Sequence, residues 1–337
     1  IFSRSYDRRD MPVEKKTGAL IGMGMTEKQG GSDVRANTTV ATRVGGGRPG
    51  GEYRITGHKW FFSCPQIDAH LVLALAADGL SCFIVPRWLP DGTKNAVRIQ
   101  RLKDKVGNKS NASSEVEFHG AHGWLLGEEG RGVPTIVEMV NVTRLDCALG
   151  STSLMRHALA QAIHHARHRA AFGKRLAEHA LMKNVLADLA LEAEAATALA
   201  LWMAQLFDAG VDPQAAALKR LYTPAAKYWL CKRAPAFCQE AMEVIGGNGY
   251  VEDSVLPRLY REAPVNSIWE GSNNVMGLDL LRALQREPSA REALHAQLGL
   301  AAREDERIAV AVDALQAQLL APSEGQARRI AEALGLT

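Results

Sequence analysis

The first third of the chain carries short apolar runs that have the length of β-strands. Turn-forming residues separate these runs at short spacing, and two of the runs alternate apolar and polar positions with a period of two. The glycine-rich stretch 45–51 predicts the loop of a hairpin. We therefore expect a small all-β domain, a barrel or a sandwich, over residues 19–126. The predicted strands are 38–44, 53–56, 70–76, 80–85, 97–99 and 115–118.

From residue 127 to residue 284 the apolar positions recur with the longer spacing of amphipathic helices. Asp212 followed by Pro213 predicts a helix start, and Gly246 and Gly247 predict a helix end. Long apolar-striped helices joined by short loops predict an antiparallel bundle. The predicted helices are 132–168, 177–209, 214–233 and 235–245, with a further one after Glu270.

The two ends of the chain complete the predicted organisation. Residues 1–18 are polar and basic without periodicity, and we expect a linker at the end of a missing N-terminal helical domain. The chain begins at Ile1 rather than Met, so we expect a fragment of a longer protein. Residues 285–337 predict a further helical extension, with helices at 289–300 and 303–320. The predicted fold class is multi-domain α+β.

Composition narrows the possible functions. With 337 residues, of which 47% are hydrophobic, the chain can form a large core or two to three domains. A net charge of +3 says little about a polyanionic partner. No apolar run approaches the ~18–20 residues that cross a bilayer, and no signal peptide is evident, so we expect no membrane partner. Five cysteines without a CxxC pair predict free thiols in a reducing cytoplasm.

Glu270 is the strongest candidate for a catalytic group. Pro264 is predicted to end regular structure, and Ile268 and Trp269 are predicted to anchor the segment in the interior. A carboxylate that follows such residues at a helix entrance predicts a base with a raised pKa. The alternative is a surface glutamate in a first helical turn, where the helix dipole favours it.

The residues after Glu270 are predicted to shape the helix entrance. Gly271 lets a backbone or a flat ligand come close. Ser272 and Asn274 are predicted to cap the periodic run that follows.

The glycine-rich loop 22–34 is the second informative stretch. It is not a dinucleotide-binding fingerprint, because Glu27 stands where the third glycine belongs, and it contains no P-loop. The loop combines backbone N–H groups with the hydroxyls of Thr26 and Ser32, which could bind a polar ring or a phosphate. The alternative is a plain turn between strands.

Five motifs in one order resemble the acyl-CoA dehydrogenase family, over residues 19–284. They look most like its adaptive alkylation-response branch, whose members are isovaleryl-CoA-dehydrogenase-like flavoproteins linked to protection of DNA. The motifs are the Thr26–Asp33 loop, Gly57-His58-Lys59 with the aromatic strand to Ser63, Arg169-Ala170-Ala171-Phe172-Gly173, Gly246-Gly247-Asn248-Gly249-Tyr250 and Ile268-Trp269-Glu270-Gly271-Ser272.

The resemblance implies a fold and a cofactor. The fold would comprise N-terminal helices, missing here, a middle β domain and a C-terminal four-helix bundle. FAD would lie between the β domain and the bundle and be shared across a dimer interface, in a homo-oligomer that is a dimer of dimers. The positions that match the family's FAD contacts are Met25, Thr26, Gly31, Ser32, Phe61, Phe62, Ser63, Arg169, Ile268, Trp269, Gly271, Ser272 and Asn274.

The resemblance also implies individual roles. Phe61 would stack near the isoalloxazine, and the Ser63 hydroxyl would lie near its N5 edge. Arg169 would reach the FAD of a neighbouring subunit, because a guanidinium pairs bidentately with a pyrophosphate. Arg144 would lie near the CoA moiety, although a surface arginine is the alternative. Glu270 would remove the α-proton of an acyl-CoA while the β-hydrogen leaves as hydride to the flavin.

Three positions depart from the family pattern. Ala180 and Glu243 stand where members often carry glutamines that help hold the partner subunit's FAD, so FAD affinity is in doubt. Lys28 replaces the usual proline of the flavin loop and is expected to loosen it. The histidines at 157–168 form a basic helix face in our interpretation, and we expect no metal site.

A second hypothesis is a flavin-containing DNA-binding protein with only residual dehydrogenase activity. Residues 284–337 contain six Arg and no Lys against eight acids, so this tail is not basic. The remaining candidates are the arm 4–16 and a helix face with Arg156, Arg167 and Lys174. We therefore expect the intact protein to bind duplex DNA without sequence preference and this fragment to bind it poorly.

Overall fold

The computed structural model describes residues 3–44 and 50–336, with side chains up to residue 335. Most of the predicted hairpin loop 45–51 lies outside the described residues. The chain divides into two compact units, Ile1–Val140 and Asn141–Thr337, and the boundary falls within helix α1 (Gly132–His168). Each unit is described by itself. None of the described helices is long and apolar enough to cross a membrane.

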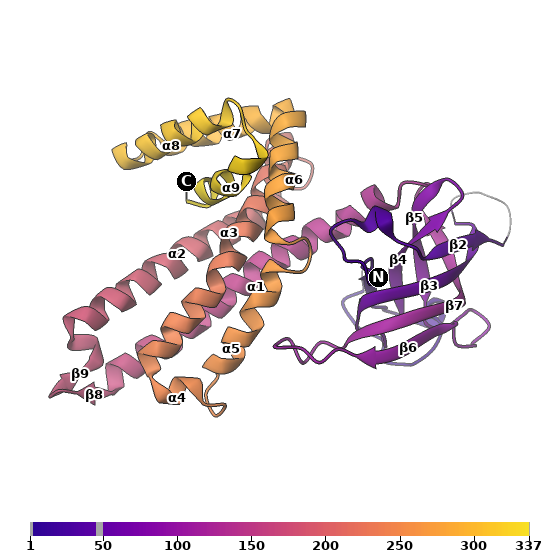
Figure 1. The fold of residues 1–337 in the computed structure, drawn as a ribbon, viewed down its shortest axis with the longest axis horizontal. Helices are drawn as coiled ribbons and strands as arrows, with labels where there is room; N and C mark the ends of the chain where they lie inside the picture. Colours follow the sequence, from indigo (N-terminus) through magenta and orange to yellow (C-terminus); the bar gives the residue numbers. More distant parts are fainter. Residues whose placement is uncertain (1–2, 45–49, 337) are drawn as a thin grey trace. The chain divides into compact units, whose positions relative to one another are not determined.

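The first unit is a seven-stranded sheet that closes into a barrel (Figure 1). Closure follows from the pairing, because β4 joins β2 on one side and β5 on the other, while β5 joins β7 and β7 joins β3. β6 pairs only with β7 and forms an edge. The strands are β1 Ile21–Gly24, β2 Val40–Arg43, β3 Glu52–Ser63, β4 Ala69–Ala76, β5 Gly79–Pro86, β6 Val97–Leu102 and β7 Ser113–Leu126.

The burial of β4 explains its continuous apolar run. Tyr53, Phe62 and Phe118 fill the barrel core inside the sheet. On the other face, Leu71 and Leu73 of β4 pack with Ile136 from the start of α1. A strand covered on both faces has no polar side to alternate with. Sequence patterning missed β1, because two of its four residues are glycines, which disfavour strands.

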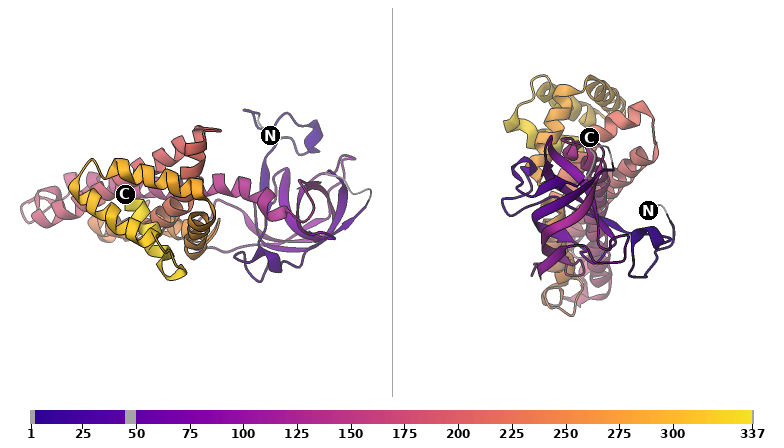
Figure 2. Two further views of the ribbon diagram at one scale, coloured as in Figure 1. Left: turned by 90° about the horizontal axis from the view of Figure 1, so that it is seen from above. Right: turned by 90° about the vertical axis from the view of Figure 1, so that its right-hand side faces the viewer.

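The second unit is the predicted antiparallel helical bundle with additional helices after it. α3 contacts α2, α6, α7 and α9, and the yellow helices α7, α8 and α9 in Figures 1 and 2 form one group that packs on α3 through α7 and α9. Alanines occupy many of the buried positions and allow the helices to pack closely. The helices are α1 Gly132–His168, α2 Ala180–Asp208, α3 Pro213–Ile245, α4 Gly247–Tyr250, α5 Leu256–Glu262, α6 Asn273–Arg286, α7 Pro288–Ala301, α8 Glu306–Leu319 and α9 Ala327–Leu336.

One predicted break in the bundle is wrong. The third and fourth predicted helices are a single helix, α3, which runs through Pro224 and Pro235. Each proline removes one backbone hydrogen bond and would end an exposed helix. Around Pro235, however, Cys231, Ala234 and Cys238 are buried in the bundle core. Tertiary packing therefore outweighs the local helix-breaking tendency.

Candidate functional site

Glu270 lies in a reversed turn between a 3-10 helix, Ala263–Ser267, and α6. The backbone φ angles are 58° at Glu270 and 96° at Gly271, so two successive residues are left-handed. That conformation costs a non-glycine residue on the order of 1–3 kcal/mol. The φ of Gly271 is the main reason for a glycine there; a Cβ would also lie 2.4 Å from the flexible end of the Met276 side chain, which would have to move. The turn directs the Glu270 side chain toward α1.

Side chains of α1 and α3 hold this turn through hydrogen bonds. Arg144 Nε donates to the Glu270 carbonyl at 3.1 Å, and Lys227 Nζ donates to the Gly271 carbonyl at 2.6 Å. The Thr143 hydroxyl donates to the Glu270 carboxylate at 2.8 Å. The surrounding structure thus fixes a strained backbone that the local sequence alone would not adopt.

Burial raises the pKa of the Glu270 carboxyl, and Asp146 acts in the same direction. The Thr143 hydroxyl and the charges of Lys227 and Arg144 lower that pKa and limit the rise. The predicted direction of the shift is confirmed, and the alternative of a freely solvated surface glutamate is excluded. A half-buried carboxylate with a raised pKa and a fixed backbone can act as a general base.

The predicted apolar anchoring of this turn is wrong for Ile268, whose side chain is 65% exposed. Asn266 is the buried residue instead: it accepts a hydrogen bond from Trp269 Nε1 at 3.1 Å and donates to Ser151 Oγ at 3.2 Å. A 3-10 turn presents every third residue to the same side. Ala263 and Asn266 share the buried side, and Ile268 faces away from it.

The predicted boundary signals around the turn also differ from the structure. α5 ends at Glu262, two residues before Pro264, but regular structure continues, because Pro264 lies in the first turn of a 3-10 helix. Ser272 occupies the N-cap position of α6 without a side-chain cap hydrogen bond. α6 begins at Asn273, so Asn274 lies within the first turn and does not cap it.

Arg144 is buried, with 9% of its surface exposed, so the surface alternative is wrong. Its Nη1 donates to Asp279 Oδ2 at 2.9 Å, and Asp279 in turn accepts a hydrogen bond from Arg220 at 2.9 Å. These contacts, together with the Glu270 carbonyl, place Arg144 beside the candidate base. Its role near CoA stays a prediction.

In the first unit, a buried ion pair connects two of the sequence motifs. Lys59 Nζ lies 2.7 Å from Glu27 Oε1, and both side chains are 0% exposed. Glu27 also accepts hydrogen bonds from the backbone N–H groups of Thr38 and Thr39 at 2.6 and 3.1 Å. Burial opposes ionisation of Glu27, but Lys59 and these donors together lower the pKa of Glu27 to about 2. Burial lowers the pKa of Lys59 to about 8.

The ion pair brings the glycine-rich loop to the end of β3. The Trp60 N–H donates to the Thr26 carbonyl at 2.8 Å, directly beside the pair. Met25 and Thr26 are half-buried, whereas Gly31 and Ser32 are exposed. The Thr26 and Ser32 hydroxyls form no hydrogen bond with any residue that the structure describes. They are available to a ligand.

A β-bulge shapes the aromatic end of β3. Between Lys59 and Phe62 the strand has one residue more than β7, which opposes them with Val116 and Ser114. Lys59 and Phe62 therefore both point into the core, while Phe61 is 52% exposed. Phe62 stacks on His70 at a ring distance of 3.9 Å and contributes its side chain to the core, not to the surface. The exposed Phe61 and the half-buried Ser63 remain on the candidate surface.

Arg169 and the residues after it form a small hairpin that projects from the end of α1. The hairpin consists of β8 Ala170–Ala171 and β9 Lys174–Arg175, and Arg169 is exposed at its base. Phe172 at its tip is 96% exposed and has a φ of 51°. The conformation of Phe172 is one that non-glycine residues rarely adopt.

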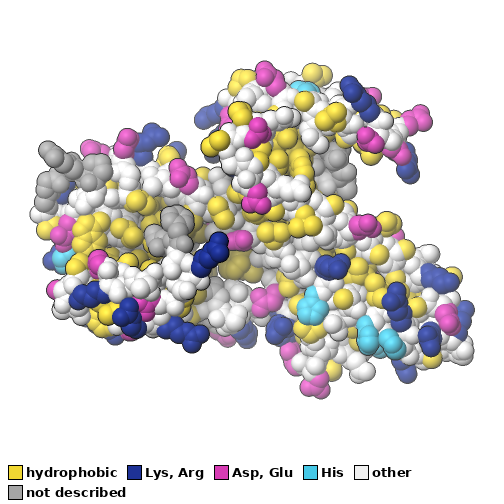
Figure 3. Space-filling view, turned by 180° about the vertical axis from the view of Figure 1, so that it is seen from behind, with side chains coloured by type: hydrophobic (Ala, Val, Ile, Leu, Met, Phe, Trp, Pro, Cys, Tyr) yellow, Lys and Arg dark blue, Asp and Glu magenta, His cyan; other side chains and the backbone are white. Residues whose placement is uncertain are grey.

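The histidine-rich face of α1 is exposed as predicted. His157, His164 and His168 are exposed, as is Arg167. Figure 3 shows histidine and cationic side chains near one another on one face of this unit. Among the described residues, no group of three or more His, Cys, Asp or Glu side chains is placed to hold a metal ion.

The departures from the family pattern lie at the surface. Ala180 is the first residue of α2, and Glu243 lies in the last turn of α3. Both are exposed. Lys28 is also exposed, and its ammonium lies 5.2 Å from the centre of the Trp60 ring. None of the three leaves a gap in a core.

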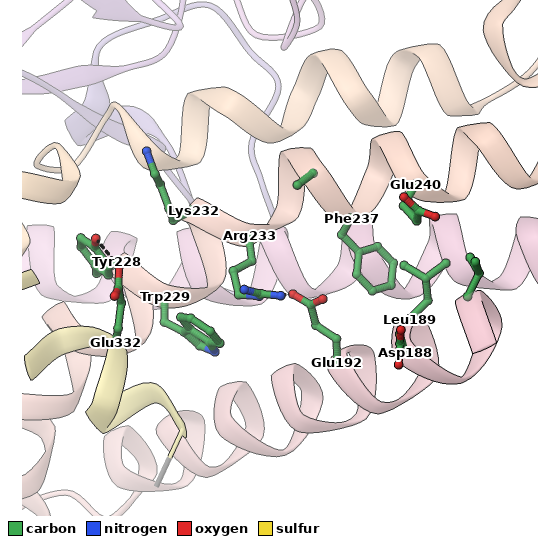
Figure 4. A pocket seen from close by; sticks show the side chains of 12 residues that line it. Asp188, Leu189, Glu192, Tyr228, Trp229, Lys232, Arg233, Phe237, Glu240 and Glu332 are labelled. Carbon is green, nitrogen blue, oxygen red and sulfur yellow. Dashed lines mark hydrogen bonds and ion pairs between the residues drawn. The ribbon is translucent and has the colours of Figure 1, made fainter. Parts of the chain in front are cut away.

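A cleft of about 530 Å³ opens between α2, α3 and α9 (Figure 4). Arg233 pairs with Glu192 and lies 4.6 Å from the centre of the Trp229 ring. Tyr228 donates to Glu332 at 3.0 Å. No residue that we predicted for the site lines this cleft.

Sequence reasoning missed two side chains of the site, Thr143 and Lys227, and it did not predict that Glu27 and Lys59 form an ion pair. Lys227 carried a usable signal, because it interrupts the apolar run Ala225–Leu230 inside a predicted helix. A lysine on the buried face of a helix is rarely there without a partner.

Comparison with protein families identifies both units. The model described as "Acyl-CoA dehydrogenase, middle domain" matches residues 22–121. The model described as "Acyl-CoA dehydrogenase, C-terminal domain" matches residues 130–285.

Individual relatives agree with this assignment. The chain is 53% identical over 336 residues to the protein "Putative acyl-CoA dehydrogenase AidB" of Escherichia coli (strain K12). That match covers 100% of this chain and 61% of the relative. It is 33% identical over 317 residues to acyl-CoA dehydrogenase family member 11 of Caenorhabditis elegans. That match covers 88% of this chain and 51% of the relative. The chain therefore spans between half and two thirds of the length of these relatives.

A solved structure is similar as well. The crystal structure of Caenorhabditis elegans ACDH-11 in complex with C11-CoA superimposes with a TM-score of 0.86 at 31% identity. That match covers 94% of this chain and 60% of the solved one. The family and branch predicted from the motifs are confirmed by these comparisons.

Proposed function

Because this chain belongs to the acyl-CoA dehydrogenase family, we propose that it dehydrogenates an acyl-CoA thioester at the α and β carbons, with FAD as the electron acceptor. The observation that carries this proposal is the environment of Glu270. Its carboxyl has a raised pKa, and its backbone is held left-handed by Arg144 and Lys227. Those are the properties of a positioned general base.

The residues present fit a flavin. In the first unit, Phe61 offers an exposed aromatic face, and the hydroxyls of Thr26 and Ser32 have no competing partner among the described residues. In the second unit, the N-terminus of α6 presents free backbone N–H groups behind Ser272, and such groups favour phosphate. We propose that these residues, with Met25, Gly31 and Ser63, bind FAD. Arg169 on the exposed hairpin would reach the FAD of a second subunit.

The chemistry of this chain is a proton transfer. Bound FAD would supply the acceptor for the β-hydrogen, which leaves the substrate as a hydride. Glu270 takes the α-hydrogen as a proton, and the electron pair of the broken Cα–H bond becomes the new double bond to Cβ. Thr143 donates to the same carboxylate and orients it. The raised pKa makes the carboxylate a stronger base than a solvated glutamate.

The test is Glu270→Gln in the full-length protein. Glutamine has nearly the same shape but cannot accept the proton, so anaerobic bleaching of the flavin by acyl-CoA thioesters should slow about 10²–10⁴-fold. The flavin spectrum should stay unchanged. Glu240→Gln is the matched control, because Glu240 is an exposed glutamate on α3. Equal bleaching by wild type and Glu270→Gln would show that another group is the base.

We propose non-specific duplex DNA as a second partner, supported by the 53% identity to AidB and by exposed cations. Arg156, Arg167 and Lys174 are exposed on α1 and its hairpin. The N-terminal arm offers less than its composition predicts, because Lys16 is buried against Asp68. Affinity for one duplex at several salt concentrations tests this, since n phosphate contacts give a log–log slope near −0.9n. A slope of zero for the full-length protein would exclude this partner.

A further inference from the structure

Lys227 is a fully buried lysine in the middle of α3. Its surface is 0% exposed, and its neighbours in the helix, Ala226 and Tyr228, are buried as well. The ammonium donates to the Gly271 carbonyl at 2.6 Å. Within the described part of the chain, no carboxylate forms an ion pair with it. Among the described residues, the hydrogen-bond partner of this ammonium is therefore a backbone carbonyl and not a carboxylate.

Such an arrangement is unfavourable for stability by itself. A buried cation loses its hydration, and a single carbonyl restores little of it. A methionine would fill the same space without this loss. A lysine at this position therefore calls for an explanation beyond packing.

The charged and titratable groups around Lys227 come from α1, α3 and the turn. α1 contributes Arg144 and Cys147, α3 contributes Cys231, and the turn contributes Glu270. Burial raises the pKa of Cys231 and raises that of Cys147 to about 12, so both thiols stay neutral near pH 7. Burial lowers the pKa of Lys227, and Arg144 adds to that effect. Glu270 is thus the anion on which the ammonium acts.

Arg144 and Asp146 complete the surroundings of Glu270. The guanidinium of Arg144 forms an ion pair with Asp279 at 2.9 Å, and Asp279 is shared with Arg220. Asp146 opposes ionisation of Glu270. Lys227 has no comparable carboxylate partner, so its charge is less compensated than that of Arg144.

We propose that Lys227 is a positioning residue for Glu270, which fixes the left-handed turn through the Gly271 carbonyl and favours the ionised carboxylate through its charge. This inference rests on the proposed function of Glu270 as the base. The hydrogen bond determines where the carboxylate lies, and the charge determines at which pH it is ready to accept a proton. The two contributions can be separated by substitution.

Two variants separate them. Lys227→Met keeps an unbranched side chain that is one atom shorter and has neither donor nor charge. Lys227→Gln keeps a donor without the charge. Lys232→Met is the matched control, because Lys232 is an exposed lysine five residues further along α3. Circular dichroism and thermal unfolding of each variant establish that it is folded.

The first measurement is the pH profile of single-turnover flavin bleaching in the full-length protein, loaded with FAD and mixed with an acyl-CoA thioester. Misplacement of a base by about 1 Å costs ~10²-fold, so Lys227→Met should be about 10–100 times slower than wild type. The rising limb of the profile should move to higher pH in both Lys227 variants. Lys227→Gln should recover part of the rate but not the pH shift. Lys232→Met should match wild type.

The second measurement needs neither flavin nor substrate. Carbon-13 NMR of glutamate-labelled full-length protein follows the Glu270 carboxyl during a pH titration, with Glu270→Gln to assign the signal. The Glu270 titration should move to higher pH in Lys227→Met and Lys227→Gln. An unchanged titration would overturn the inference, whatever the bleaching assay shows.

The outcomes distinguish this inference from the proposed function. If wild type is not bleached by any acyl-CoA, the proposed function fails, while the carboxyl titration still tests the effect of Lys227. If wild type is bleached and Lys227→Met is equally fast with the same pH profile, the inference fails and the proposed function stands. If Lys227→Met does not fold, Lys227→Gln and the NMR titration decide.

Discussion

Among the described residues, two lysines are 0% exposed, Lys59 in the first unit and Lys227 in the second, and their partners differ. Lys59 in the barrel lies 2.7 Å from the Glu27 carboxylate. Lys227 in the bundle lies 2.6 Å from the Gly271 carbonyl. Both side chains are 0% exposed, so burial alone does not distinguish them.

The different partners of the two lysines indicate different roles. The charge of Lys59 is cancelled by Glu27, and the pair joins two segments that are 32 residues apart in the sequence. Its effect is to hold the glycine-rich loop against β3. The charge of Lys227 is not cancelled and acts on Glu270. A neutralised pair is suited to structure, whereas an uncompensated charge is suited to adjusting a reactive group.

The largest expected effect is a difference in stability between Lys59→Met and Lys227→Met. Lys59→Met leaves Glu27 buried without its cation, which should reduce the free energy of unfolding by about 3–5 kcal/mol. Lys227→Met removes a buried charge and should change that free energy by no more than about 1 kcal/mol. Urea unfolding of both variants measures the difference.

A double variant provides the control for this comparison. Replacing Glu27 by Gln together with Lys59→Met removes both charges and should recover much of the loss. Equal stability of the two single lysine variants would contradict the distinction between the lysines.

His70 is a third buried titratable group, and it differs from the two lysines because burial favours its neutral form. Burial lowers the pKa of His70 to about 4, against the smaller effect of its hydrogen bond to the Ser63 carbonyl. Between about pH 6.5 and 4 the unfolded chain takes up a proton that the folded chain does not, so the stability present above pH 6.5 is lost as the pH falls. The loss should reach roughly 3 kcal/mol by pH 4.

The measurement is the free energy of unfolding as a function of pH, for wild type and for His70→Gln. The variant should have a flatter curve between pH 6.5 and 4. A curve that is equally steep in both proteins would assign the acid sensitivity in this range to groups other than His70.

The smallest expected effect concerns the turn that Lys227 holds. Ile268 is 65% exposed, so Ile268→Ala should change the free energy of unfolding by less than about 0.5 kcal/mol. Asn266→Ala is the matched comparison: it removes a buried side chain that bonds Trp269 and Ser151 and should cost about 1–3 kcal/mol. Thermal unfolding compares the two. A larger loss for Ile268→Ala would show that apolar contacts, and not hydrogen bonds, hold the turn.

Much of the fold was predictable, because it depends on periodicity within single elements. The apolar run at 70–76 and the helical spacing from residue 132 correspond to β4 and α1. The continuation of α3 through Pro235 could not be predicted, since it depends on packing against helices distant in the sequence. β1 was missed because a short glycine-containing strand has almost no pattern of its own.

The candidate site was predictable only where a motif contains the residue. Glu270 stands in such a motif, and the predicted direction of its pKa shift is correct, although Ile268, one of the two neighbours on which that prediction rested, is exposed. The groups that set that pKa come from elsewhere: Thr143 is 127 residues away from Glu270 in the sequence. Lys227 is 44 residues from Gly271. Contacts of this kind arise from tertiary structure and leave only a weak trace, such as a lysine in an apolar run.

The bulge in β3 has a consequence for how the aromatic surface of the barrel could have evolved. Lys59 and Phe62 keep their partners on β7 on either side of the extra residue. A single inserted codon at this point therefore adds one outward side chain and leaves the core on both flanks in place. The aromatic residue at this surface could be gained or lost in one mutational step without passing through a misfolded intermediate. Deletion of Phe61 would retrace that step in the laboratory, returning β3 to regular alternation.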